Sequence, residues 1–248
     1  MLKNSNSGFW RSDSTVRTER VCSAPGRWAL LGSALLVGLW WELVTLVEDQ
    51  FGSLFAPVAA LVGPSLSYLD ALFFESVGLV GVCYLVGRQV FGCDAAEVFA
   101  LRPSRLGTLA SCGLGGFILY WCPTFLGRTG PGSVSVEAYD LFGMVMCSVV
   151  IFPLVEETVI RGYLYRLLRL RLKALGALVA TTAITLGMHY RTIMAVGADG
   201  VGLFALTVLF VTCCLLVEVR QSILPSIAFH VGYNVGYVIC WAAVTTSS

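Results

Sequence analysis

The chain has 248 residues, of which 57% are hydrophobic and only 12% are charged, whereas soluble domains carry about 25% charged residues. This composition and a mean hydropathy of +0.81 exclude an ordinary soluble domain and predict an all-α, polytopic membrane protein. The net charge of +1 says nothing about an acidic partner, because the position of the charges along the chain matters more in such a protein. The sequence has no basic tract interleaved with aromatic residues that would predict nucleic-acid binding.

The chain divides into a polar start and a long apolar remainder. Residues 1–27 are polar, and we expect a flexible cytoplasmic tail there. For residues 28–248 we expect a single transmembrane domain, because no loop is long enough to hold another domain. Seven segments are long enough to cross a bilayer, near Trp28–Val47, Leu66–Gly87, Leu106–Leu126, Tyr139–Ile160, Leu175–Ala195, Val201–Val217 and Ile223–Val244.

The positions of the basic residues test this topology, because each added span moves every later loop across the membrane. With a cytoplasmic N-terminus, 14 of the 16 Lys and Arg residues lie on the inner side, and only Arg128 and Arg191 lie outside. The shorter run Phe51–Val62 therefore predicts a re-entrant or interfacial piece rather than an eighth span. We expect an integral, multi-pass protein of the cell (inner) membrane, in contact with membrane lipids.

Small residues in two of the spans indicate close helix packing. Gly113 and Gly116, and likewise Gly232 and Gly236, have spacings that let helices approach closely, and we interpret them as packing positions. Seven of the nine cysteines lie in apolar runs, where a thiol packs as a small hydrophobic group. No C-x-x-C pair occurs, so the sequence predicts neither a disulfide framework nor a zinc knuckle.

Two adjacent carboxylates, Glu156 and Glu157, lie at the end of one predicted span, where ionisable groups are costly and mark a functional site by default. Neighbouring residues point about 100° apart on a helix, so the two acids cannot face the same pocket. Glu157 and Arg161 have the i,i+4 spacing of an ion pair, which leaves Glu156 as the free carboxylate. Pro153 removes a backbone hydrogen bond nearby and predicts a kinked or loosened helix.

Both histidines of the chain, His189 and His230, fall in predicted spans, and Asn234 shares a helix face with His230. A carboxylate with two imidazoles and an amide can activate water, with Glu156 as general base and an imidazole or amide donating to the oxyanion. Alternatively, Glu156, His189 and His230 could bind a zinc ion whose water attacks. An inert polar network that fixes helix packing is the third possibility, and spacing alone does not separate the three.

Three motifs, in this order and at these span positions, resemble the CPBP family of intramembrane endopeptidases, also called Abi or CAAX-protease-like: Glu156-Glu157-x-x-x-Arg161-Gly162, then His189, then His230-x-x-x-Asn234. The resemblance implies a family-like catalytic core at about 139–244. It also implies a membrane-anchored or lipidated protein or peptide as substrate. Catalysis in the family is described either without a metal or, as the alternative, with zinc.

The resemblance implies a role for each residue of the motifs. Glu156 would be the catalytic glutamate that activates water, and Asn234 would help to bind the oxyanion. Both histidines would assist catalysis, while Glu157 and Arg161 would form a supporting pair.

One position departs from the family pattern. The family usually has Phe four residues before the first histidine, and this chain has Thr185 there. A Phe would pack the pocket wall and keep it dry, whereas Thr leaves a smaller, partly polar wall. We expect the difference to affect substrate preference more than catalysis, because every titratable position is retained.

Two other classes of function compete with an endopeptidase. A non-enzymatic membrane protein, of the bacteriocin-immunity or scaffold type, would use the same residues only to hold helices together. An ion or proton transporter would use Glu42, Asp70 and Glu75 as a relay. No pattern of basic partners around these acids favours the transporter.

Overall fold

The computed structural model describes residues 31–33, 35–37, 39, 64–91, 94–125, 141–190, 193 and 200–245. All regular secondary structure in these residues is helical, which confirms the predicted all-α class. The predicted polar tail, the piece at 51–62, Glu42 and most of the first predicted span lie outside the described residues.

The described helices follow the other predicted spans in order. They are α2 (Pro64–Phe91), α4 (Leu106–Phe125), α8 (Ala174–Met188), α10 (Gly200–Arg220) and α11 (Leu224–Thr245). A short helix that was not predicted, α3 (Ala95–Val98), lies between α2 and α4. Between α4 and α8 runs one continuous helical segment, the central helix, composed of α5 (Leu141–Val145), η1 (Met146–Ile151), α6 (Phe152–Glu156), η2 (Glu157–Tyr165) and α7 (Arg166–Arg169). The segments η1 and η2 have π-helical winding.

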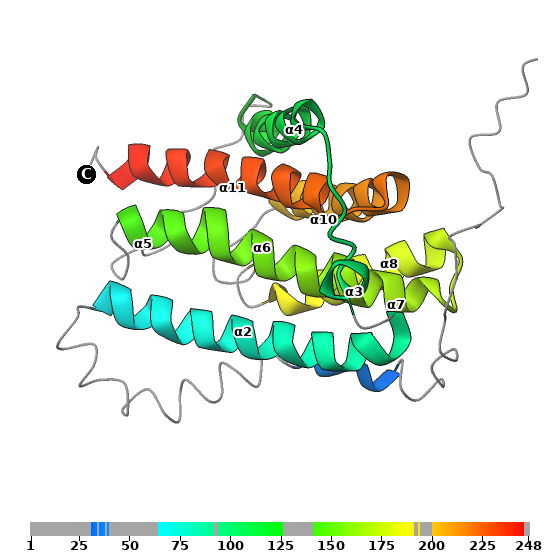
Figure 1. Ribbon diagram of the computed structural model, residues 1–248. Coiled ribbons are helices and arrows are strands. Elements are labelled where there is room, and N and C mark those ends of the chain that lie inside the picture. Colours follow the sequence, from blue (N-terminus) through cyan, green and yellow to red (C-terminus); the bar gives the residue numbers. More distant parts are fainter. Residues whose placement is uncertain are drawn as a thin grey trace, which may run out of the picture.

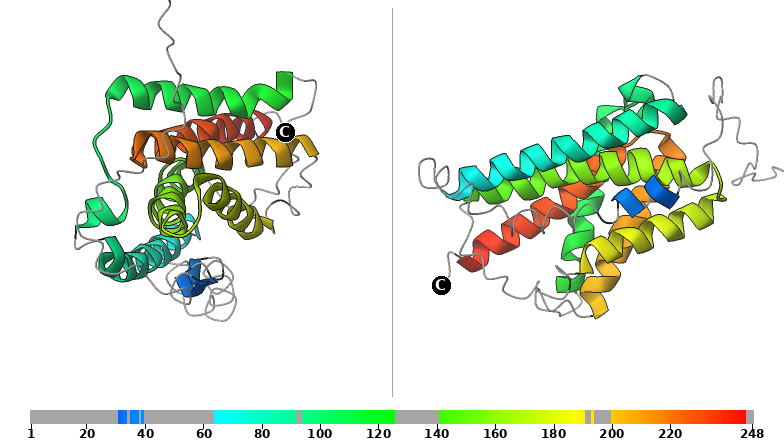
Figure 2. Two further views of the ribbon diagram at one scale, coloured as in Figure 1. Left: turned by 90° about the vertical axis from the view of Figure 1, so that its right-hand side faces the viewer. Right: turned by 90° about the horizontal axis from the view of Figure 1, so that it is seen from below.

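The helices form a layered bundle around the central helix. In Figures 1 and 2, α4 lies on one side and α2 on the opposite side, with α10 and α11 next to α4 and the central helix between them and α2. Figure 1 views α4 nearly along its axis but α2 and the central helix from the side, so α4 crosses their direction. Functional groups on the central helix can therefore meet groups from α8, α10 and α11.

The central helix extends beyond its predicted end at Ile160 and continues to Arg169. The predicted span ended directly before Arg161. Arg161 is fully buried, however, and its charge is matched by Glu157 on the same helix. Because the charge is neutralised inside the bundle, it does not end the helix.

Pro153 lies between the two π-helical stretches, as the predicted loosening of the helix requires. The N–H of Phe152 donates to the carbonyl of Cys147, five residues earlier. In the same winding, the carbonyl of Ser148 would accept from residue 153, and proline has no N–H. The Ser148 carbonyl is therefore available to a partner from another helix.

Glycines bring α4 and α11 into backbone contact, which confirms their interpretation as packing positions. A Cβ added to Gly116 would overlap the carbonyl oxygen of Phe229, and one added to Gly232 would overlap that of Gly113. Such contacts exclude any side chain at these positions. They fix α11, the helix that carries the second histidine, against the rest of the bundle.

Two stretches of the described residues, Phe142–Arg169 and Gly200–Arg220, are long and apolar enough to cross a membrane. Shorter apolar helices run over Ser76–Phe91, Leu106–Cys122 and Ala174–Met188. The helix α8 ends earlier than the predicted Leu175–Ala195, because His189 forms its C-terminal cap. Seven spans and a cytoplasmic N-terminus stay predictions.

Candidate active site

A partly exposed pair of an acid and an imidazole lies where α6 meets the end of α8. Oε2 of Glu156 is 3.6 Å from Nε2 of His189, a separation too long for a direct hydrogen bond. Oε2 makes no hydrogen bond with any described residue. The side chains of Glu156 and His189 keep 17% and 24% of their surface exposed, while Oε2 itself is buried.

The backbone of α8 sets the orientation of the His189 ring. Nδ1 lies 2.8 Å from the carbonyl oxygen of Thr185, and a carbonyl can only accept, so Nδ1 carries the proton. In the neutral ring, Nε2 then presents its lone pair toward Glu156. Two acceptor atoms therefore lie side by side, an arrangement suited to one water molecule that donates to both.

An aromatic residue packs beside this pair, but it comes from α10 and not from position 185 of α8. The ring of Phe210 lies 5.1 Å from the imidazole of His189 and 5.2 Å from the guanidinium of Arg161. Thr185 is fully buried, and its hydroxyl donates to the carbonyl of Thr181. Sequence reasoning missed Phe210, because nothing distinguishes one aromatic residue from the others in an apolar helix.

Glu157 belongs to a closed network that joins η2 to α11. Its Oε1 lies 3.2 Å from Nη1 of Arg161 and 2.9 Å from Nδ1 of His230. Its Oε2 accepts a hydrogen bond from the hydroxyl of Ser226. Glu157 and Arg161 have no exposed side-chain surface. The ion pair predicted from the i,i+4 spacing is thus present, within a larger buried network.

His230 contacts a different carboxylate from the one expected. The predicted pocket combined it with Glu156, but α11 packs on the helix face that carries Glu157, and adjacent residues cannot share a face. Its Nδ1 must carry a proton to donate to that carboxylate. Phe210 contacts both His189 and Arg161, so the two groups of residues form neighbouring parts of one site.

Asn234 binds the backbone of the central helix rather than Glu156. Its Nδ2 donates to the carbonyl oxygen of Ser148 over 2.7 Å, and this is the carbonyl that Pro153 leaves without an intrahelical donor. Asn234 therefore joins α11 to the central helix at a local defect. His230 and Asn234 do share one face of α11, as predicted, since both contact this helix.

The zinc alternative requires Glu156, His189 and His230 around one point. Nδ1 of His230 faces Glu157 instead. Within the described parts of the chain, no group of three or more His, Cys, Asp or Glu side chains is arranged to hold a metal ion. The residues as placed do not fit a three-ligand metal site.

The helical fold and the Glu156–His189 pair define a class, namely helical membrane proteins with a polar site that can activate water. A family model described as "Type II CAAX prenyl endopeptidase Rce1-like" matches residues 138–236. Residues 138–236 thus match an Rce1-like domain, and this match confirms the resemblance drawn from the motifs. The matched region includes every residue of the site described above. No curated protein and no solved structure matches the chain significantly.

Proposed function

We propose that this protein is an intramembrane endopeptidase that hydrolyses peptide bonds of a membrane-associated protein with water activated by Glu156. One observation carries the proposal: Oε2 of Glu156 and Nε2 of His189 lie 3.6 Å apart, partly exposed, beside a buried network that holds the neighbouring charges. The match to an endopeptidase family supports a peptide bond as the target.

The proposed reaction begins with a water molecule that donates its protons to the two acceptors. As the water oxygen bonds to the carbonyl carbon of the peptide, Glu156 takes one proton. That proton then passes to the leaving nitrogen, and the C–N bond breaks. His189, fixed through Thr185, orients the water.

We further propose seven spans, a cytoplasmic N-terminus and a location in the cell membrane. The substrate class is a membrane-anchored or lipidated protein, since the matching family is described by CAAX prenyl endopeptidases. Basic residues that follow the site, Arg166, Arg169 and Arg171, support cleavage near the inner face of the membrane.

The proposal is tested by comparing membrane peptides from cells that carry the wild-type protein or Glu156→Gln. This substitution keeps the shape of the side chain and removes the base. We expect C-terminal or sorting-tail cleavage products only with the wild type. Identical products with both proteins would overturn the proposal. A non-enzymatic immunity or scaffold protein predicts instead that every folded Glu156→Gln sample keeps its biological effect.

The cofactor is tested separately with a chelator series on purified protein. The proposal assigns no step to a metal, so we expect cleavage to continue at chelator concentrations that remove zinc. Loss of cleavage with rescue by added zinc would assign the water activation to a metal instead.

A further inference from the structure

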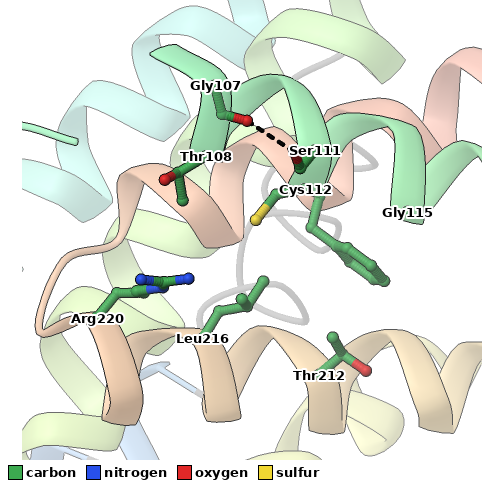
Figure 3. Close-up of a pocket in the computed structure, with 9 residues that line it drawn as sticks. Gly107, Thr108, Ser111, Cys112, Gly115, Thr212, Leu216 and Arg220 are labelled. Carbon is green, nitrogen blue, oxygen red and sulfur yellow. Dashed lines mark hydrogen bonds between the residues drawn. The ribbon is translucent and has the colours of Figure 1, made fainter. Parts of the chain in front are cut away.

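A polar cavity lies between α4 and α10 (Figure 3). It has a volume of about 400 Å³ and shares no residue with the Glu156–His189 pair or with the Glu157 network. Its lining combines a guanidinium and hydroxyl groups with apolar side chains, among them Arg220, Thr108, Ser111, Cys112, Leu216 and Phe229. A polar end beside an apolar wall is the pattern that an amphiphilic ligand requires.

Arg220 supplies the only formal charge among the side chains that line this cavity. Figure 3 shows its guanidinium extending between Thr108 of α4 and Leu216 of α10. No described residue forms a hydrogen bond or ion pair with it. Glu218, the acid nearest in sequence, is already bound by Arg169 at 2.9 Å and by the hydroxyl of Tyr165 at 2.8 Å. The cavity therefore has a net positive charge.

The hydroxyl groups are not equivalent as donors. Ser111 donates to the carbonyl of Gly107 over 2.8 Å, so its hydroxyl proton is already used, as the dashed line in Figure 3 marks. Thr108 makes no such side-chain bond with the described residues and can donate to a ligand beside Arg220. Arg220 and Thr108 together can bind one anionic group.

The cavity lies at the predicted inner boundary of the membrane. The helix α4 begins directly after Arg102 and Arg105, and α10 ends at Arg220, all on the predicted cytoplasmic side. Ser222 donates to the carbonyl of Arg102 over 2.7 Å, which holds the two loops together. Lipid phosphates lie at this depth, and basic side chains near it attract anionic lipids.

We propose that this cavity binds the phosphate of an anionic phospholipid. Arg220 pairs with the phosphate oxygens, because the planar guanidinium matches their geometry, and Thr108 donates a further hydrogen bond. The glycerol and the first acyl carbons lie against Leu216 and Phe229. This apolar wall is what distinguishes a lipid from free phosphate. The proposal rests on the membrane location and not on peptide cleavage.

The test uses purified full-length protein in neutral detergent, titrated with phosphatidylglycerol, phosphatidylcholine or glycerol phosphate. Thermal unfolding and native mass spectrometry report binding. We expect phosphatidylglycerol to bind and to raise the unfolding temperature, while the other two have small effects. Arg220→Gln weakens the affinity for phosphatidylglycerol by about tenfold or more, the value of a charge-assisted hydrogen bond. The matched control Arg105→Gln, which removes an exposed charge outside the cavity, keeps it.

Each other outcome contradicts the proposal. Equal weakening by Arg105→Gln and Arg220→Gln would indicate diffuse attraction to the whole basic face. Full, Arg220-dependent binding of glycerol phosphate would assign the cavity to a soluble phosphate, and a prenylated peptide that displaces the lipid competitively would assign it to substrate. If Arg220→Gln does not fold, Thr108→Val and Leu216→Trp test the same cavity without changing its charge. Unaltered lipid binding in both variants would then overturn the proposed site.

Discussion

Two adjacent glutamates of the same helix have opposite surroundings. Glu156 keeps 17% of its side chain exposed and has one imidazole nearby at 3.6 Å. Glu157 is fully buried, and its two oxygens meet a guanidinium, an imidazole and a hydroxyl. Both oxygens of Glu157 already have partners and are buried, whereas Oε2 of Glu156 has no hydrogen-bond partner among the described residues and can take a proton.

The two glutamates therefore have different roles, one in the reaction and one in holding the helices together. The open pair, Glu156 and His189, has the contacts expected of reacting groups, while the closed network of Glu157, Arg161, Ser226 and His230 has those of a rigid support. Breaking a buried ion pair costs more stability than altering a partly exposed one. Substitutions on the two sides should therefore produce different measurable losses.

The largest effect on the open side is expected from His189→Gln. Removing an imidazole that orients the attacking water should lower the cleavage rate by roughly 10² to 10⁴-fold, the range of general acid–base catalysis. The unfolding temperature should change little, because the side chain is partly exposed. Tyr190→Phe, at the exposed next position, is the control and should cleave normally. A normal rate for His189→Gln would remove this residue from the mechanism.

The next effect concerns the bond between Asn234 and the Ser148 carbonyl. Asn234→Leu removes the donor and should lower the free energy of unfolding by roughly 1 to 3 kcal/mol, the cost of an unsatisfied buried acceptor. Pro153→Ala supplies a backbone N–H to the same helix and should offset part of this loss. Chemical denaturation of both single variants and the double variant gives the coupling. Strictly additive losses would show that Pro153 and Asn234 act independently.

The smallest effect is expected at Phe210, which contacts both sides of the comparison. Phe210→Leu keeps an apolar side chain but removes the ring from Arg161 and His189, and cation–π contacts contribute about 0.5 to 2 kcal/mol. We expect a modest fall in both stability and cleavage. Phe204→Leu, on the same helix with a largely exposed ring, is the matched control. Equal effects of the two substitutions would exclude a special role for Phe210.

Features that depend on local spacing were predicted well from the sequence. The helical class, the ion pair of Glu157 with Arg161 and the close approach at Gly116 and Gly232 all appear in the structure. Each follows from residues a few positions apart on one helix, or from the size of a single side chain. The resemblance to the family rests instead on motifs in three separate spans, and the family match confirms that resemblance.

Features that depend on which helix faces pack together could not be predicted. His230 contacts Glu157 because α11 packs on that face, and nothing in the sequence distinguishes the two neighbouring acids as its partner. The bond from Asn234 to the Ser148 carbonyl could not be predicted either, because it depends on π-helical winding before Pro153. The end of the central helix was also placed too early, since a buried Arg161 does not behave as a charge at a membrane surface.

The most direct test of the account compares Glu156→Gln with Glu157→Gln in two measurements, cleavage rate and free energy of unfolding. Glu218→Gln, in the partly exposed pair with Arg169, is the control and should cost about 0 to 1 kcal/mol. We predict that Glu156→Gln lowers cleavage by roughly 10² to 10⁴-fold with nearly normal stability, and that Glu157→Gln lowers stability by roughly 3 to 5 kcal/mol. Normal cleavage by Glu156→Gln, or equal stability losses in the two variants, would contradict the division between a reacting and a supporting glutamate.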